Sequence, residues 1–198
     1  MNREVQERAQ RRDRWVDVVV VGVFAVALAL GWGLKTSAEA RAVSFAGDAI
    51  TAQYPAGWVQ AKTELPVVFQ VEDRLATPFR TTIAVQRLPL PADGVNALAT
   101  VHSTMVLDRG TQWTAFRVLN TSAEAVVGGR SGMLATFAYV ENNPNPFLET
   151  LPVVMEGEDF LFAVGDQAYV VTLTAAEANF DRMKGALERF VQALQVQE

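Results

Sequence analysis

A long apolar run near the start of the chain constrains its fold more than any other feature. Residues 15–34, WVDVVVVGVFAVALALGWGL, carry no charged side chain between Asp17 and Lys35. A helix of this length rises about 30 Å, which is the thickness of the hydrocarbon core of a bilayer. The run therefore predicts one transmembrane helix over residues 15–34.

The charges on either side of this run predict its orientation. The basic head, residues 1–14, contains five arginines and three acidic residues, whereas the linker, residues 35–42, has only Lys35 and Arg41 as basic side chains. By the positive-inside rule, the N-terminus lies in the cytoplasm and residues 35–198 lie outside the membrane. We therefore expect a single-pass protein of the plasma (inner) membrane with a periplasmic or extracellular C-terminal domain.

A cleaved signal peptide is the alternative interpretation of the same segment. Ala38-Glu39-Ala40 and Ala40-Arg41-Ala42 both have the small-x-small pattern of a cleavage site. The apolar run is longer than the usual signal-peptide core of about 7–15 residues, which favours an uncleaved anchor.

Small residues recur within the apolar run at spacings of three and four. Gly22, Ala25, Ala29 and Gly33 therefore share one face of the predicted helix. Small side chains allow the backbone of a second transmembrane helix to approach closely. We expect this face to pack against another membrane-protein subunit, with the rest of the helix in contact with the lipid bilayer.

The predicted outer domain, residues 43–198, is acidic and contains no cysteine. It carries ten basic and seventeen acidic side chains, a net charge of −7, which disfavours binding to nucleic acid. The absence of cysteine excludes disulfides, thiolate metal sites, a cysteine nucleophile and a lipid-modified cysteine. His102 is the single histidine, which excludes a histidine-rich metal site.

The sequence also lacks the common catalytic patterns. It contains no nucleophile elbow, no histidine pair and no dinucleotide-binding fingerprint, so we expect no catalytic residue and no cofactor. Glu156, Glu158 and Asp159 offer the oxygen ligands that calcium prefers, but they do not match the calcium-loop pattern. A solvated acidic turn, and not a metal site, is expected there.

Hydrophobic periodicity divides the outer domain into strands and two helices. The first helix is predicted from Asp93, a favourable N-cap, to Gly110, with an apolar stripe that includes Val101 and Met105. The predicted strands are Val43–Phe45, Ala49–Tyr54, Val67–Val71, Thr81–Leu88, Trp113–Val118, Ala123–Val127, Met133–Val140, Val153–Met155, Phe160–Val164 and Ala168–Leu173.

The second helix, at the C-terminus, has the clearest pattern. Thr174 and Glu177 have the spacing of a capping box. The order of the elements, with hairpin-length turns late in the chain, predicts an α+β fold with helices covering an antiparallel sheet. The apolar stripe of the helix comprises Phe180, Met183, Leu187, Phe190, Val191 and Leu194.

A proline-broken loop starts at Glu141 and carries apolar side chains in a segment expected on the surface. Phe147, Leu148 and Leu151 are the residues concerned. Apolar side chains on an irregular loop either turn back onto the core or contact a partner, and both interpretations stay open. The three residues are therefore our candidates for partner contact.

Three short motifs occupy characteristic places in the outer domain. A strand runs into Tyr54–Trp58, a glycine-rich turn spans Gly128–Gly132, and the strand Tyr169–Leu173 leads directly into the terminal helix. In these features residues 43–198 resemble the PsbP/Mog-type family. The resemblance implies an α-β-α sandwich with a central antiparallel sheet.

The members of that family are mostly adaptors. They include extrinsic subunits on the lumenal face of photosystem II, lipid-modified cell-envelope proteins and proteins that bind a small GTPase. This chain differs from them in its predicted transmembrane helix and in the absence of a cysteine for lipidation. No catalytic or metal-binding residue of the family matches a position in this sequence.

These observations predict a non-catalytic, single-span accessory subunit of a larger membrane protein complex. The resemblance implies an energy-transducing complex, photosynthetic or respiratory, in which the outer domain stabilises assembly or the docking of an electron carrier. The acidic surface makes a basic soluble protein a further candidate partner. The alternative is a membrane-tethered envelope domain that binds a lipid or another small apolar ligand, which requires an open cavity between sheet and helix.

Overall fold

The computed structural model describes residues 20–33, 41–92, 96–142 and 151–197 of the chain. The chain divides into two compact units, Met1–Arg41 and Ala42–Glu198. The second unit contains the predicted outer domain, and we use that name for it below.

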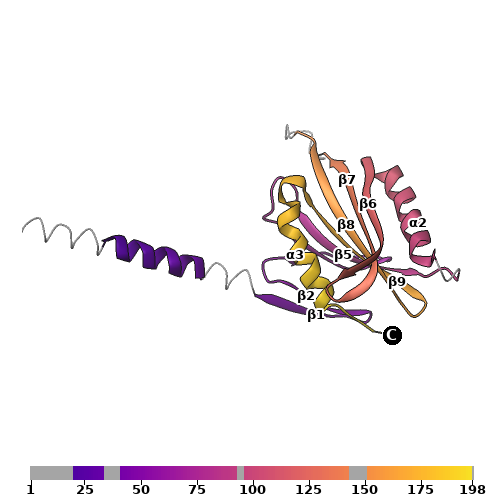
Figure 1. Cartoon of the computed structure of the whole chain (residues 1–198), viewed down its shortest axis with the longest axis horizontal. Coiled ribbons are helices and arrows are strands. Elements are labelled where there is room, and N and C mark those ends of the chain that lie inside the picture. The colour runs from indigo at the N-terminus through magenta and orange to yellow at the C-terminus, as the bar shows by residue number, and fades with distance from the viewer. Residues whose placement is uncertain (1–19, 34–40, 93–95, 143–150, 198) are drawn as a thin grey trace, which may run out of the picture. The chain divides into compact units, whose positions relative to one another are not determined.

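In the first unit, residues 20–33 form a helix (Figure 1). Gly22, Ala25, Ala29 and Gly33 all lie in this helix, so their spacing does bring them to one face. Among the residues that the structure describes, no helix combines the length and the apolar character needed to cross a bilayer. Residues 15–19 and 34 of the expected span lie outside the described residues, so the anchor stays a prediction.

The outer domain is a mixed α+β structure built on a seven-stranded antiparallel sheet. Consecutive strands β6 to β9 pair as hairpins, whereas β5 pairs with β9 from the other end of the domain. In spatial order the strands are β3 (Val59–Gln60), β4 (Val67–Asp73), β5 (Thr81–Pro89), β9 (Gln167–Ala176), β8 (Val153–Val164), β7 (Arg130–Glu141) and β6 (Thr114–Val127).

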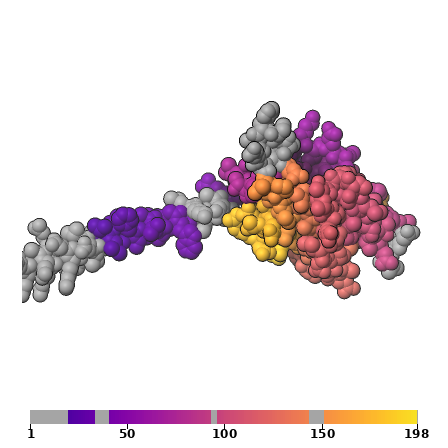
Figure 2. Space-filling model, turned by 90° about the horizontal axis from the view of Figure 1, so that it is seen from above, coloured from indigo at the N-terminus to yellow at the C-terminus, as the bar shows by residue number. Residues whose placement is uncertain are grey.

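A second, three-stranded sheet and two helices complete the outer domain. The small sheet has the order β1 (Ala42–Ala46), β2 (Ile50–Pro55) and β10 (Gln195–Val196), all antiparallel. The helices are α2 (Ala97–Gln112) and α3 (Glu177–Ala193). They lie on opposite sides of the large sheet, and α3 forms part of the domain surface (Figures 1 and 2).

The side-chain period of the strands explains the two covered faces. Consecutive residues of a strand point to opposite faces, and Phe160 and Val171 pack in one hydrophobic cluster while their neighbours Leu161 and Val170 pack in another. The first cluster includes the buried face of α3, and the second includes Val101 of α2. Both central strands, β8 and β9, are therefore buried on both faces.

Strand β8 corrects the expected acidic turn. The sequence predicted two strands separated at Glu156-Gly157, but β8 runs without interruption from Val153 to Val164. Gly157 lies opposite Phe137 on β7, and a β-carbon at this position would lie 2.1 Å from the Phe137 ring. The glycine therefore makes room for an aromatic ring that packs over the strand, and it does not mark a turn.

Strand β6 is likewise one element where two were predicted. It runs from Thr114 to Val127. Its pairing with β7 shifts register three times, which lets one strand continue through the irregular apolar pattern between the two predicted strands. The turn that follows contains Gly128 with a φ of 56°, where a β-carbon would approach the backbone nitrogen of Gln192 to 2.5 Å. The close approach of α3, together with the left-handed backbone, requires glycine at this turn.

The predicted capping box of the terminal helix is wrong. Strand β9 extends to Ala176, which occupies the N-cap position of α3 without a side-chain hydrogen bond. The Thr174 hydroxyl lies instead 2.6 Å from the hydroxyl of Thr82 across the sheet. Sheet pairing therefore outweighs the local capping preference at this position.

Candidate functional site

A polar cleft of about 830 Å³ opens on the sheet face that α2 covers, next to the C-terminal end of the helix. The cleft exists because α2 packs over β8 and β9, whereas the same face of β4 and β5 is lined by polar side chains. Residues that line it include Gln70, Arg74, Phe79, Arg80, Thr82, Gln86, Arg109, Trp113, Tyr139, Glu141, Thr172 and Thr174.

One wall of the cleft is a buried ion pair between α2 and β8. Arg109 donates to both carboxylate oxygens of Asp159, through Nη1 to Oδ2 and through Nη2 to Oδ1 at 3.0 Å. The Thr172 hydroxyl donates to Asp159 Oδ1 at 2.6 Å and accepts from Arg109 Nη2 at 3.3 Å. Only 9% of the Arg109 side chain and 2% of the Asp159 side chain are exposed. A buried pair with this bidentate geometry holds the end of α2 against the sheet.

Aromatic rings enclose the same guanidinium. Its central carbon lies 4.9 Å from the ring centroid of Trp113 and 4.7 Å from that of Phe137. Trp113 in turn packs against Tyr139, with ring centroids 4.4 Å apart. These cation–π contacts add to the ion pair because the Arg109 side chain is buried. The wall is therefore preformed.

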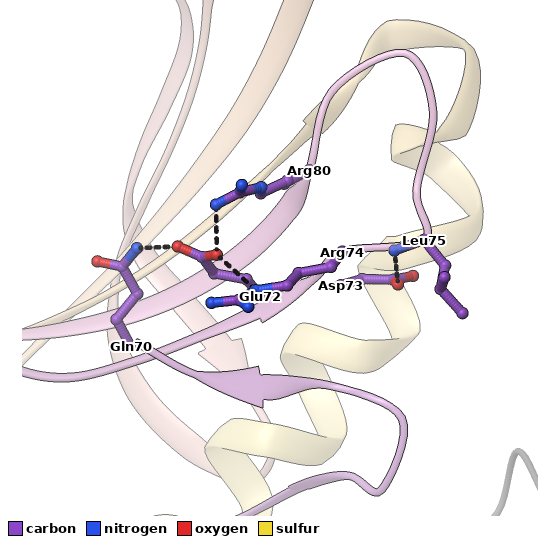
Figure 3. Close-up of polar contacts among 6 residues, drawn as sticks. All are labelled: Gln70, Glu72, Asp73, Arg74, Leu75 and Arg80. Carbon is purple, nitrogen blue, oxygen red and sulfur yellow. Dashed lines mark hydrogen bonds and ion pairs between the residues drawn. The ribbon is translucent and has the colours of Figure 1, made fainter. Parts of the chain in front are cut away.

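The opposite wall is a cluster of polar contacts on β4 and the loop that follows it (Figure 3). Arg80 Nη1 donates to Glu72 Oε2 at 2.9 Å, and Arg74 Nε lies 3.7 Å from the same oxygen. Gln70 Nε2 donates to Glu72 Oε1 at 3.2 Å. The Glu72 side chain is only 12% exposed, whereas those of Arg74 and Arg80 are 54% and 59% exposed. The carboxylate thus anchors two arginines at the rim of the cleft.

The floor of the cleft carries hydroxyl groups from the central strands. The Thr82 and Thr174 hydroxyls lie 2.6 Å apart, one on β5 and one on β9. Burial raises the pKa of the Tyr139 phenol well above its usual range, and the negative charge of Glu141 raises it further. Tyr139 is therefore a neutral hydroxyl group at physiological pH.

The charges around the cleft cancel. The arginines Arg74, Arg80 and Arg109 are matched in number by three carboxylates: Glu72 pairs with Arg74 and Arg80, Asp159 pairs with Arg109, and Glu141 lines the cleft. Glu72 and Asp159 both accept hydrogen bonds from arginine, and these ion pairs hold the walls of the cleft in place.

An apolar groove of about 560 Å³ lies beside this cleft, between α2 and β5. Gln86 lines both hollows, and Asp108 in the groove is followed directly by Arg109 in the cleft. The apolar groove is lined by Pro66, Gln86, Leu88, Pro89, Pro91, Thr100, Val101, Thr104, Met105 and Asp108.

Leu151, the described residue among those that the sequence predicted for partner contact, does not line the polar cleft. Leu151 is 84% exposed, and Phe147 and Leu148 lie outside the described residues. The roles of these residues stay predictions.

His102 is half-buried on α2, and burial lowers its pKa despite the nearby carboxylate of Asp159.

Of the acidic residues Glu156, Glu158 and Asp159, only Asp159 lies on the other face of the sheet, because side chains alternate along β8. Asp159 faces α2, whereas Glu158 faces α3, where burial raises its pKa although Lys184 lies nearby. In the part of the chain that the structure describes, no group of three acidic or histidine side chains is arranged to hold a metal ion.

Sequence analysis missed Arg109, which is central to the cleft. The helical spacing could have identified it. Arg109 continues the buried stripe of α2 four residues after Met105, so a charged side chain was to be expected on the face that meets the sheet. Its partner Asp159 is 50 residues away in the chain, a distance over which spacing gives no information.

Comparisons with known proteins find similarity in structure alone. Neither protein-family models nor curated protein sequences match this chain. The solution structure of cyanobacterial PsbP from Synechocystis sp. PCC 6803 matches with a TM-score of 0.51 and 14% identity, over 81% of this chain and 94% of that one. At this identity the match concerns the fold, and it confirms the PsbP/Mog-like fold expected for the outer domain.

Two further solved structures match less closely. The Ran-binding protein Mog1p from Saccharomyces cerevisiae has a TM-score of 0.49 and 16% identity, over 79% of this chain and 94% of that one. LpqN from Mycobacterium tuberculosis, described as involved in cell envelope biogenesis, has a TM-score of 0.47 and 12% identity, over 80% of this chain and 91% of that one.

Proposed function

We propose that this chain is a non-catalytic, single-span accessory subunit of a larger membrane protein complex, and that its outer domain docks to a partner on the extracytoplasmic face. The observation that carries the proposal is the polar cleft, whose two walls are braced by ion pairs and whose rim is exposed. A preformed site binds without a large ordering cost, which suits an adaptor.

The rim of the cleft has the composition of a docking surface. Leu75 follows Arg74 in the loop after β4, and its side chain is 86% exposed. Its backbone is held in place, because the Leu75 N–H donates to Asp73 Oδ1 at 3.0 Å (Figure 3). Arginine is enriched among the residues that dominate binding energy in interfaces, and an exposed apolar side chain beside it adds surface that a partner can bury. Leu75, with Arg74 and Arg80, is therefore the contact we assign to the partner.

The resemblance to PsbP favours an energy-transducing complex, photosynthetic or respiratory. The face of Gly22, Ala25, Ala29 and Gly33 would pack against a membrane subunit, and Leu151 is a further candidate for contact outside the membrane. A basic soluble protein, attracted by the acidic outer domain, is a further partner that this role accommodates.

Co-purification of the full chain in mild detergent tests the proposal. We expect a stoichiometric partner that is retained by the wild type and lost with Leu75→Asp, which places a charge in the contact. Leu107→Asp is the matched control, because Leu107 is also exposed but lies on α2 away from the cleft lining. A monomer without a stoichiometric partner, or equal loss in both variants, contradicts the proposal.

The anchor has a separate test. Sequencing the N-terminus of the mature protein distinguishes an intact membrane helix from a cleaved signal peptide. A mature chain that starts at Arg41 or Val43 would contradict the anchor.

A second candidate function is binding of a lipid or another small apolar ligand. The specific observation that favours it is the apolar groove, because it opens between β5 and α2, where this alternative requires a space. In this role the predicted membrane helix would hold the outer domain close to its ligand.

A further inference from the structure

We infer that the apolar groove and the polar cleft form one amphipathic site for a single-chain amphiphile with an uncharged, hydroxyl-bearing head. The acyl or alkyl chain lies in the groove and the head lies in the cleft. This inference rests on the second candidate function and names the ligand class and its orientation.

The two hollows adjoin along one flank of α2. Gln86 on β5 lines both, and Pro66 and Asp108 in the groove are followed directly by Val67 and Arg109 in the cleft. A ligand that extends along β5 therefore passes from apolar to polar surroundings at Gln86. The order along the flank fixes the direction in which an amphiphile can bind.

The groove end suits a hydrocarbon chain. Leu88, Pro89, Val101 and Met105 supply apolar walls. Each methylene removed from water contributes about 0.8 kcal/mol, so each methylene added within the groove raises affinity about three- to fourfold. The gain ends when the groove is filled, which distinguishes a bounded site from adsorption to the protein surface.

The cleft end suits a head without net charge. Its three arginines are matched in number by the carboxylates of Glu72, Asp159 and Glu141, so the cleft has no net charge to offset the hydration that a charged head would lose. The hydroxyls of Thr82 and Thr174 and the amides of Gln70 and Gln86 line the cleft as well. Hydroxyl and amide groups both donate and accept hydrogen bonds, which matches a head that carries hydroxyls.

The experiment uses the full chain reconstituted in phosphatidylcholine vesicles with photoreactive monoacylglycerols. One probe carries its diazirine at the end of the acyl chain, and the other carries it on the glycerol head. Trypsin cuts after Arg74, Arg80, Arg87 and Arg109, so most of the groove lining falls in residues 88–109, whereas residues 75–80 and 81–87 carry lining of the cleft. We expect the tail probe to label residues 88–109 and the head probe to label residues 75–80 and 81–87.

A matched pair of variants tests the groove. Thr104 and Ser103 are neighbouring exposed residues of α2, and only Thr104 lines the groove. Thr104→Trp fills the groove, and displacing two methylenes from it lowers labelling of residues 88–109 by about tenfold or more. Ser103→Trp leaves the labelling unchanged. A fatty acid and an alkylammonium ion of equal chain length serve as charged competitors, and both displace the probe more weakly than unlabelled monoacylglycerol does.

Each outcome is decisive. Reversed or identical labelling by the two probes, insensitivity to Thr104→Trp, or equal competition by a charged amphiphile overturns the inference. If the tail probe labels residues 88–109 but charged amphiphiles compete equally, the assigned head is wrong while apolar-ligand binding stands. If neither probe labels the outer domain, both the inference and the second candidate function fall, and the co-purification test of the accessory role is unaffected.

Discussion

Removing one partner of the ion pair beneath the cleft is expected to destabilise the outer domain strongly. Asp159→Asn leaves the Arg109 guanidinium buried without its counter-charge, between β8 and the end of α2. Breaking a buried pair in this way costs about 3–5 kcal/mol. Because a domain is stable by only about 5–15 kcal/mol in total, the variant should be close to unfolding.

Replacing the whole polar cluster should cost much less. In Arg109→Met/Asp159→Leu/Thr172→Val no charge or hydroxyl of the cluster is left without its partner. Substituting a buried ion pair by apolar residues of similar volume is often neutral or stabilising. We therefore expect the triple variant to lie within about 2 kcal/mol of the wild type, a range set by the repacking of a changed core.

The assay is urea-induced unfolding of the full chain followed by tryptophan fluorescence, because Trp113 lies against the Arg109 guanidinium. A loss below about 1 kcal/mol in both single variants, or a triple variant no better than either, refutes the reasoning.

Three further outcomes can be measured by thermal or urea unfolding. Gly157→Ala should cost about 1–3 kcal/mol, because its β-carbon would meet the Phe137 ring, whereas Gly185→Ala in α3 has open space and should gain about 0.5–1 kcal/mol; equal effects would contradict the assigned packing. Burial raises the pKa of Glu158 above 4.5, so its ionisation in the folded state costs stability as pH rises; Glu158→Gln should be more stable than the wild type at neutral pH, with the difference vanishing below pH 4.5. Leu187→Ala should cost about 2–5 kcal/mol, and a cost under about 1 kcal/mol would mean that α3 docks by another face.

Local patterns in the sequence predicted most elements of the outer domain. The strand predicted over Thr81–Leu88 is β5, Thr81–Pro89, and the terminal amphipathic stripe is the buried face of α3. These predictions succeed because the period of apolar side chains depends on the local backbone and on which face is buried.

Features that depend on distant partners could not be predicted in the same way. From the sequence, Gly157 was predicted to lie in a turn. The glycine is required by the Phe137 ring, which lies on another strand, so the local sequence could not show the reason for it. The two-residue strands β3 and β10 have no recognisable period, and they exist because β4 and β2 pair with them. The polar cleft is of this kind too, since Arg109 and Asp159 meet only through the packing of α2 on the sheet.

The small sheet determines how the outer domain responds to mechanical load. A pull that arrives along the chain from residue 41 reaches β1 first, and β1 is held to the domain by its five-residue ladder with β2 and by the packing of Phe45 against Phe69. The ladder begins at Ala42 opposite Pro55, the open end of the hairpin, so tension can unzip its hydrogen bonds one after another. The large sheet starts only at Val59, and it would therefore stay intact while β1 peels away.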